Sequence, residues 1–418
     1  MSFTSLGLHS LLLEQVELLG YQTPTPIQLE AIPAVLANKD VMAGAQTGTG
    51  KTAAFALPLL HRLFETHQIE NSVPNNQVSV LVLTPTRELA QQVYKSFCDY
   101  GQALLLRSVA AYGGASINPQ IDEIKQGVDV LVATPGRLLE LVMKDLVDVS
   151  QLKTLVLDEA DRMLDMGFII DIQRILKRLP QQKQTLFFSA TFDDAIFKLS
   201  KTLLQDPVLI EVDQRNTSAE QVEQTFYTVD KEKKSGLISY LIGSKNWQQV
   251  LIFTRTKEGA DRLAKEMKKD GIDTQAIHGD KSQGARDRVL AAFKAGELRA
   301  LVATDVAARG LDIEALSYVI NHELPYNAED YIHRIGRTGR AGQSGLAVSL
   351  LTEKENYLLK DIEKLLDTPL ASQWFPGFEP DLDKPESKSN KRPLSNKEKR
   401  NQALGIKPKA KNKRPRRR

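Results

Sequence analysis

The chain of 418 residues is 42% apolar and 26% charged with a net charge of +3, a composition typical of a globular protein with a sizeable core. A single cysteine, Cys98, excludes an internal disulfide and a cysteine-based metal site, and the six histidines show no metal-ligand spacing. No stretch approaches the ~18 consecutive apolar residues of a membrane helix, and no secretory signal is visible at the N-terminus. We therefore expect a reducing cytosolic or nuclear compartment and no membrane partner.

Short apolar runs alternate with amphipathic stretches through the first ~205 residues, which predicts a parallel sheet covered by helices. The strands of this first series are predicted at 41–43, 78–83, 128–133, 155–157 and 185–188. A second series begins near residue 220, with strands predicted at 250–253, 274–277, 300–303, 318–320 and 347–351. The chain is thus predicted to be α/β, with domains at 1–205 and 221–370 and a linker at 206–220.

A phosphate-binding loop is predicted between the strand at 41–43 and the helix that follows it. Its residues are Ala45, Gln46, Thr47, Gly48, Thr49, Gly50, Lys51 and Thr52. The glycines let backbone N–H groups face the phosphates, and the helix N-terminus adds its positive dipole. Lys51 would neutralise the β- and γ-phosphate charge, and Thr52 would hold Mg²⁺. The alternative is a glycine-rich turn without a ligand, which the Gly-Lys-Thr sequence disfavours.

Carboxylates follow the strand predicted at 155–157, where the sequence is Asp158-Glu159-Ala160-Asp161. The carboxyl ends of strands form the binding edge of an open α/β sheet. Asp158 is placed there to help hold the metal, directly or through water, and Glu159 is the better candidate to orient and polarise an attacking water. The alternative is a helix N-cap, where acidic residues are favoured. The phosphate loop earlier in the chain favours the catalytic interpretation.

The two series of strands resemble copies of one another at an offset of 170 residues. Residues 80–90 match 250–260 at six of eleven positions, and 131–134 match 301–304 at the same offset. Two matches at one offset favour an internal duplication over a chance likeness between apolar strands. The glycine-rich loop at 45–52 has no counterpart at 215–222. We therefore expect one nucleotide site, completed by the second domain across a cleft.

The C-terminal segment is strongly basic. Residues 384–418 contain nine Lys, six Arg and two Glu, a net charge of +13, so the other 383 residues together carry −10. Blocks of like charge are typically disordered, and a basic block suits a polyanion such as nucleic acid. We predict a basic disordered tail over 371–418, which either contacts nucleic acid or only aids solubility.

Together these segments resemble the DEAD-box RNA helicases over about residues 3–345. The region 20–28, with Phe3 upstream, is similar to the adenine-reading Q motif of that family, which we place at 1–29. The other matching segments are 85–90, 113–114, 134–137, the literal Asp-Glu-Ala-Asp at 158–161, 189–191, 251–254, Gln283 with Arg286, 303–312 and 331–340. Ala45 is also what this family has there, whereas Lys281 departs from its frequent Met. The short flanks and the segment 376–380 look like the bacterial RhlE subgroup, and we expect a cytoplasmic protein.

The resemblance implies two tandem RecA-like domains that bind ATP. Gln28 would read adenine through its amide, and Phe3 would stack on the base, with Tyr21 in the same binding region. Asp305 would meet the ribose. Arg337 and Arg340 would be arginine fingers supplied by the second domain. A further set would couple hydrolysis to RNA binding: Asp161, Ser189, Thr191 and His333.

The resemblance also implies a set of RNA contacts. These are Thr86, Arg87, Gly114, Thr134, Arg137, Arg286 and Thr304. Arginine, hydroxyl and glycine residues suit sugar–phosphate oxygens more than base edges. We therefore expect a grip on one strand with little sequence preference. Each of these residues alone could equally serve as a helix cap or a turn residue.

The sequence thus predicts an ATP-dependent RNA helicase, an RNA-stimulated ATPase that opens short duplexes or remodels RNA–protein complexes by closing two domains. Its expected partners are RNA and ribosomal or other ribonucleoprotein complexes, and we expect a monomer. One alternative is a DNA helicase of the same superfamily, which the Q motif and the segment 189–191 disfavour. Another is an ATP-gated RNA clamp or annealing chaperone with little unwinding, which the basic tail would suit.

Overall fold

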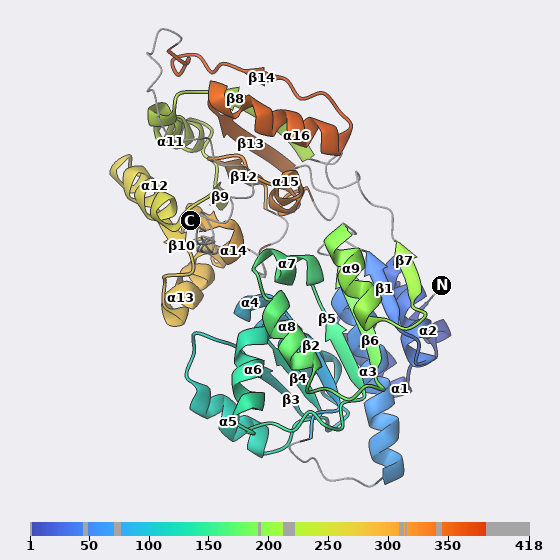
Figure 1. Cartoon of the computed structure of the whole chain (residues 1–418). Coiled ribbons are helices and arrows are strands. Elements are labelled where there is room, and N and C mark those ends of the chain that lie inside the picture. The colour runs from blue at the N-terminus through green and yellow to red at the C-terminus, as the bar shows by residue number, and fades with distance from the viewer. Residues whose placement is uncertain are drawn as a thin grey trace, which may run out of the picture. The chain divides into compact units, whose positions relative to one another are not determined.

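The computed structural model describes residues 2–44, 49–70, 77–190, 194–211, 222–308, 313, 316–339 and 345–381. The chain divides into two compact units, shown in Figure 1. The described residues up to 211 belong to unit 1, and those from 222 onward belong to unit 2. No helix in the described part is both long and apolar enough to cross a membrane.

Unit 1 is built on a seven-stranded parallel sheet in the order β3-β4-β2-β5-β6-β1-β7. Its strands are β1 (Val41–Gly44), β2 (Val80–Leu83), β3 (Ser108–Ala111), β4 (Val130–Ala133), β5 (Thr154–Leu157), β6 (Gln184–Ser189) and β7 (Val208–Glu211). Its helices are η1 (Phe3–Leu6), α1 (Ser10–Leu18), α2 (Pro26–Leu36), α3 (Lys51–Glu70), α4 (Arg87–Tyr100), α5 (Ile117–Lys125), α6 (Pro135–Met143), α7 (Ala160–Asp165), α8 (Ile169–Leu176) and α9 (Asp194–Leu203).

Helices cover both faces of this sheet, as Figure 1 shows. Successive side chains of a strand point to opposite faces, so β2 sends Val80 and Val82 into one apolar cluster and Leu81 and Leu83 into another. Helices α1–α4 pack into the first cluster, and α5–α9 pack into the second. Because both faces are buried, the central strands are continuous apolar runs rather than alternating ones.

Unit 2 has a second seven-stranded parallel sheet, in the order β10-β11-β9-β12-β13-β8-β14. Its strands are β8 (Val222–Thr228), β9 (Val250–Thr254), β10 (Thr274–Ile277), β11 (Ala300–Thr304), β12 (Tyr318–Asn321), β13 (Gly345–Leu351) and β14 (Ser372–Gln373). Its helices are η2 (Lys231–Lys233), α11 (Lys234–Ser244), α12 (Lys257–Lys269), α13 (Gln283–Lys294), α14 (Asp305–Ala308), α15 (Ala328–Ile335), η3 (Glu353–Glu355) and α16 (Asn356–Leu366).

The two sheets have the same strand order when their strands are numbered along each unit. Strands β2 and β9, which contain the segments that match at an offset of 170, occupy the third position in both orders. The local hydrogen bonds repeat as well. The hydroxyl of Thr84 donates to the carbonyl of Thr86 at 3.3 Å, and that of Thr254 donates to the carbonyl of Thr256 at 3.3 Å. The topology therefore supports the predicted duplication.

The structure differs from the predicted boundaries at two places. The predicted linker at 206–220 includes β7, which pairs with β1 in the sheet of unit 1, while 212–220 lies outside the described residues. The predicted tail over 371–418 includes β14, which pairs with β8. β14 is a two-residue exposed edge strand without an apolar run, whereas β7 is a short edge strand whose apolar run at 208–210 was assigned to the predicted linker.

The segment after β14 packs onto unit 2 through aromatic side chains. The ring of Phe375 lies 5.3 Å from that of Tyr227 and 5.7 Å from that of Tyr240, and Phe378 lies 5.9 Å from Tyr240. Lys233 also donates to the carbonyl of Glu379 at 2.6 Å. The chain is thus fixed to unit 2 as far as about residue 381, and the basic segment 384–418 lies outside the described residues.

Candidate active site

The predicted site residues of unit 1 that the structure describes lie where strands end. Lys51, Asp158, Glu159 and Ser189 follow or end β1, β5 and β6, which are neighbours in the sheet. The predicted RNA contacts follow the adjacent strands β3, β4 and β2, and they are Thr86, Arg87, Gly114, Thr134 and Arg137. The predicted nucleotide residues and the predicted RNA contacts therefore lie on separate halves of the carboxyl edge, here called the nucleotide half and the RNA half. The carboxylates after β5 stand at the boundary between them.

The phosphate loop is described only at its end, because residues 45–48 lie outside the described ranges. Gly50 has a φ of +88°, a conformation that favours glycine. Lys51 is the first residue of α3 and is buried, and Thr52 follows it half-buried. The lysine thus stands at a helix N-terminus, where the helix dipole favours an anion.

Gln28 connects the start of α2 to the end of the phosphate loop. Its Oε1 accepts a hydrogen bond from the backbone N–H of Thr25 at 2.9 Å, which completes a capping box. Its Nε2 donates to the carbonyl of Gly50 at 3.1 Å, and a Cβ at Gly50 would lie 2.3 Å from that nitrogen. An amide has a second N–H and further acceptor capacity, so adenine pairing is still chemically open to Gln28.

The other residues predicted to meet the base differ in exposure. Phe3 is 5% exposed and packs in the apolar core of unit 1, so its predicted stacking on adenine stays a prediction. Tyr21 is exposed, and its hydroxyl lies 3.1 Å from that of Tyr100.

Replacing Gln28 by Ala is expected to reduce the preference for ATP over GTP and to raise the KM for ATP. The amide supplies both a donor and an acceptor to one base edge, and it also holds the Gly50 carbonyl. Competition of GTP against ATP in a turnover assay measures the change. Gln92→Ala, the same substitution at an exposed position of α4, is the control. An unchanged preference for ATP would place base recognition elsewhere.

Asp158 carries a buried carboxylate. Only 3% of the residue is exposed, and burial raises the pKa of Asp158 to about 6, against the lowering effect of the Lys51 charge. Among the residues that the structure describes, its Oδ1 has no hydrogen-bond partner. No cluster of three or more His, Cys, Asp and Glu able to hold a metal occurs in the described part. An orphaned carboxylate oxygen fits a hard cation such as Mg²⁺, which completes its coordination with water and nucleotide oxygens.

Glu159 has an unusual backbone conformation for a functional side chain. Its φ and ψ of 52° and 53° are left-handed, and it forms the N-cap position of α7 without a capping hydrogen bond from its side chain. For a residue other than glycine this conformation costs about 1–3 kcal/mol and persists only where the surroundings impose it. The buried carboxylate is therefore available for a role other than helix capping.

The structure brings Asp161 and Ser189 together at the ends of β5 and β6. The hydroxyl of Ser189 donates to Oδ1 of Asp161 at 3.1 Å, and the N–H of Ala190 lies 3.4 Å from the same oxygen. Arg162 lies 3.5 Å from the other oxygen. Asp161 is thus held by the segment 189–190, and its role in coupling hydrolysis to RNA binding stays a prediction. Thr191 lies outside the described residues.

In the RNA half, two predicted residues depend on the loop after β3. Gly114 has a φ of +80°, and a Cβ there would lie 2.6 Å from Nη1 of Arg87. Glycine therefore allows this arginine to approach the loop. The hydroxyl of Thr134 accepts from the N–H of Gly113 at 3.3 Å. Thr86 caps α4 by accepting from the N–H of Leu89 at 3.3 Å, so its hydroxyl is partly engaged.

Arg137 is buried and engaged within unit 1. It donates to Oε1 of Gln120 at 2.7 Å and to the carbonyl of Ala115 at 2.9 Å, and it lies 3.2 Å from Glu140. These contacts hold the loop after β3, which carries Gly114. The structure therefore gives Arg137 a structural role, and its direct contact with RNA stays a prediction.

Not all predicted residues of unit 2 lie at the carboxyl ends of its strands, because the carbonyl of Arg337 accepts from the N–H of Leu316, which precedes β12. Thr304 ends β11 and is buried, Arg286 on α13 is also buried, and His333 on α15 is half-buried. Arg337 follows α15 and is 7% exposed. Arg340 lies outside the described residues.

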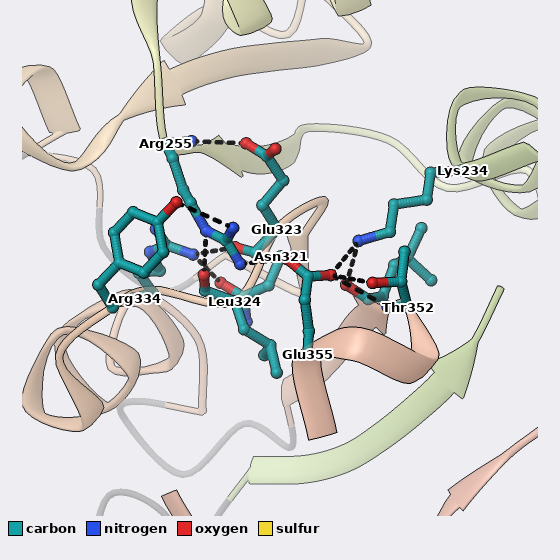
Figure 2. A network of polar contacts seen from close by, with 10 residues as sticks. Lys234, Arg255, Asn321, Glu323, Leu324, Arg334, Thr352 and Glu355 are labelled. Carbon is teal, nitrogen blue, oxygen red and sulfur yellow. Dashed lines mark hydrogen bonds and ion pairs between the residues drawn. The ribbon is translucent and has the colours of Figure 1, made fainter. Parts of the chain in front are cut away.

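Asp305 is held by an arginine to which the sequence assigns no role. Arg334 is 1% exposed and binds both carboxylate oxygens of Asp305, through Nε at 2.6 Å and Nη2 at 2.8 Å. The guanidinium also donates to Oδ1 of Asn321 and to the carbonyl of Glu323, as Figure 2 shows. Such bidentate pairing fixes geometry as well as charge. A contact of Asp305 with a ribose stays a prediction, and Arg334 is the residue that would orient it.

Comparison with known families identifies both units. Residues 25–199 match the family described as DEAD/DEAH box helicase, and residues 232–342 match the helicase conserved C-terminal domain. The DEAD-box ATP-dependent RNA helicase RhpA of Helicobacter pylori is 42% identical over 369 residues, covering 88% of this chain and 73% of RhpA. CshA of Bacillus cereus, also a DEAD-box ATP-dependent RNA helicase, is 42% identical over 363 residues, covering 87% and 68%.

Solved structures agree with these sequence matches. Dbp5 of S. cerevisiae, bound to RNA and ADP BeF3, aligns with a TM-score of 0.79 at 32% identity, covering 89% of this chain and 95% of that one. The DEAD-box helicase Mss116, bound to single-stranded RNA and UDP-BeF, aligns with a TM-score of 0.81 at 27% identity, covering 92% and 81%. With its two tandem RecA-like units, the chain belongs to the DEAD-box family of ATP-dependent RNA helicases.

Proposed function

We propose that the chain is an RNA-stimulated ATPase that opens short RNA duplexes locally or remodels RNA–protein complexes. The observation that carries this proposal is the divided carboxyl edge of unit 1. Lys51, Asp158 and Glu159 lie on the nucleotide half, and Asp161 links the ends of β5 and β6 beside them. The RNA half of the same edge follows β3, β4 and β2. The structural relatives Dbp5 and Mss116, which are bound to RNA and nucleotide analogues, support the same assignment.

In the proposed cycle, unit 1 holds ATP and unit 2 supplies Arg337 and Arg340 when the two RecA-like domains close. Lys51 binds the phosphates, and Glu159 orients the water that attacks. Thr52 and Asp158 would hold Mg²⁺, which when bound neutralises charge on the phosphates. Gripping one strand through its sugar–phosphate groups in the closed form would separate it from its partner, and hydrolysis would reopen the domains.

We further propose a cytoplasmic monomer of the bacterial RhlE-like subgroup that acts on ribosomal or other ribonucleoprotein complexes. The segment 376–380 supports the subgroup. The curated relatives RhpA and CshA come from bacteria, which supports the cytoplasmic location.

Two assays test the proposed function and separate it from its alternatives. Steady-state ATP hydrolysis is measured with single-stranded RNA and with DNA of the same sequence. A short RNA duplex is then unwound under single-turnover conditions. We expect RNA to stimulate turnover, DNA to stimulate it little, and ATP to drive strand separation. Equal stimulation by DNA would indicate a DNA helicase, and stimulation by RNA without strand separation would indicate a clamp.

Deleting residues 384–418 is expected to leave intrinsic ATPase activity unchanged and to weaken RNA binding mainly at low salt. The deletion removes a charge of +13 and no motif. If the segment neutralises Z phosphates on a single strand, log affinity falls with log salt with a slope of about −0.7Z. Affinity measured from ~50 to ~200 mM salt should therefore show a flatter slope after deletion. A chain with the segment's Lys and Arg replaced by Gln is the matched control and should resemble the deletion. Equal affinity and slope with and without the segment would leave only a solubility or docking role.

A further inference from the structure

Unit 2 retains a lysine at the position of the phosphate-loop lysine. Lys51 is the first residue of α3, the helix that follows β1, and Lys234 is the first residue of α11, the helix that follows β8. Strands β1 and β8 occupy the same position in the two sheets. Glutamates correspond in the same way, because Glu159 is the second residue after β5 and Glu323 is the second residue after β12. Two residues of the predicted nucleotide site thus have topological counterparts in unit 2, which lacks the glycine-rich loop.

The carboxylate of Glu355 forms an ion pair with this second lysine, Lys234. The ammonium of Lys234 donates to Oε2 of Glu355 at 3.0 Å and to the carbonyl of Leu350 at 2.9 Å, and its side chain is 2% exposed. Glu355 follows β13, the counterpart of β6, and ends η3. Oε2 of the same glutamate also accepts from the N–H of Thr352 at 3.0 Å. An anion surrounded by a lysine and a backbone N–H is the arrangement that a phosphate has in a nucleotide site.

The second oxygen of Glu355 continues the network. It forms an ion pair with Nη2 of Arg255, which follows β9. Arg255 in turn donates from its backbone N–H to Oε2 of Glu323 at 3.0 Å and from Nε to the carbonyl of Leu324 at 2.5 Å. Arg255 therefore fixes the loop after β12, as Figure 2 shows.

The same loop reaches the helix of the predicted arginine finger. The carbonyl of Glu323 accepts from Nη1 of Arg334 at 2.6 Å, and Arg334 binds Asp305. Arg334 lies on α15, directly after His333 and three residues before Arg337. A continuous series of contacts thus joins Lys234 and Glu355 to the end of α15.

Charge in this network is balanced, which makes Glu355 its central member. Three cations, Lys234, Arg255 and Arg334, face three carboxylates, Glu355, Glu323 and Asp305. Burial raises the pKa of Glu355, but the charges of Lys234 and Arg255 outweigh burial and hold it at about 2. Removing this carboxylate would leave three cations facing two carboxylates in a largely buried network, which is strongly unfavourable.

We propose that Glu355 is a built-in substitute for a nucleotide phosphate, and that it acts as a positioning residue for the arginine finger on unit 2. Its carboxylate closes the duplicated site against a second nucleotide. Through Arg255, the loop after β12 and Arg334, it holds the end of α15 from which His333 and Arg337 act. The positioning role rests on the proposed ATPase, whereas the phosphate-substitute role concerns unit 2 alone.

The test is replacement of Glu355 by Ala in the full chain, followed by rescue with formate, a small carboxylate. We expect kcat for RNA-stimulated ATP hydrolysis to fall by about 10²-fold, the loss that a misplaced catalytic group produces, with the KM for ATP within about twofold of the parent. Formate should restore part of the loss and raise the melting temperature of the variant, whereas chloride at the same ionic strength should do neither. Glu353→Ala, on the same 3₁₀ turn but exposed, is the control and should behave as the parent.

The outcomes distinguish the two parts of the inference. An unchanged kcat in Glu355→Ala would overturn the positioning role, and equal effects of formate and chloride on the melting temperature would overturn the phosphate-substitute role. Should Glu355→Ala not fold, Glu355→Gln keeps the side-chain volume, and a kcat within about twofold of the parent would overturn the positioning role. The turnover of the parent protein, measured first, shows whether a failure belongs to the proposed function. The melting-temperature result is independent of turnover.

Discussion

Replacing Glu159 by Gln is expected to lower ATP turnover by about 10²–10⁴-fold, the usual contribution of a positioned general base. Glutamine keeps the shape of the side chain but removes the charge that orients the attacking water. Because Lys51 and Gln28 are untouched, the variant should still bind ATP and remain on RNA. Steady-state hydrolysis measures the first effect, and binding of a fluorescent ATP analogue with retention of labelled RNA measures the second.

The matched control for this prediction is Glu14→Gln on α1, an exposed position that precedes the first strand in the sequence. It should hydrolyse ATP as the parent does. Normal turnover by Glu159→Gln would show that Glu159 does not orient the water. The left-handed backbone at this residue would then have to serve only the sharp turn from β5 into α7.

Replacing Arg337 by Ala is expected to lower RNA-stimulated turnover by about 10³–10⁵-fold, the range typical of arginine fingers in phosphoryl transfer. The backbone of Arg337 is held independently of its side chain, since its carbonyl accepts from the N–H of Leu316 at 3.1 Å and its own N–H lies 3.3 Å from the carbonyl of Arg334. The substitution should therefore leave the melting temperature of the chain nearly unchanged. Fixed-time assays of phosphate release with saturating RNA measure the loss of turnover.

Two further variants separate charge from geometry at this position. Arg337→Lys keeps the charge but not the planar fork of donors, and we expect it to remain strongly impaired. Arg288→Ala removes an exposed arginine of α13 whose Nε donates to the carbonyl of Gly284 in the same helix at 3.2 Å, and it should have little effect. Turnover of Arg337→Ala within twofold of the parent protein would exclude the finger role.

The central strands of both sheets were predictable because burial on both faces leaves a continuous apolar signal. β2, β4, β5 and β9 are examples, with every residue buried. Four strands were not predicted, although β7 contains an apolar run at 208–210. β3 is only half-buried along its length, β7 and β14 are short edge strands, and β8 mixes buried and exposed residues. Such segments are fixed by pairing with a partner strand, which a local pattern does not contain.

The site residues divide in a similar way. Lys51, Asp158 and Glu159 were identifiable because each stands in a short motif directly after a predicted strand. The network around Glu355 was not, since Arg255 and Glu355 are 100 residues apart and Lys234 and Glu355 are 121 residues apart. The one available signal was the duplication, by which Lys234 in unit 2 corresponds to Lys51 in unit 1. To match the two lysines, the strand order of both sheets must be known. The offset of 170 relates only two strands of one sheet to two strands of the other.

The short strand β14 has a consequence for how the chain can be shortened. It pairs with β8 at Phe226 and Tyr227, and the aromatic side chains that follow it cover Tyr227 and Tyr240. A chain cut before Ser372 would open that edge of the sheet, with unpaired backbone groups beside uncovered rings. Open apolar edges recruit strands from other chains, so such a truncation would favour concentration-dependent aggregation. A cut after residue 381 removes the basic segment and keeps the edge covered, so light scattering against concentration would distinguish loss of charge from loss of edge protection.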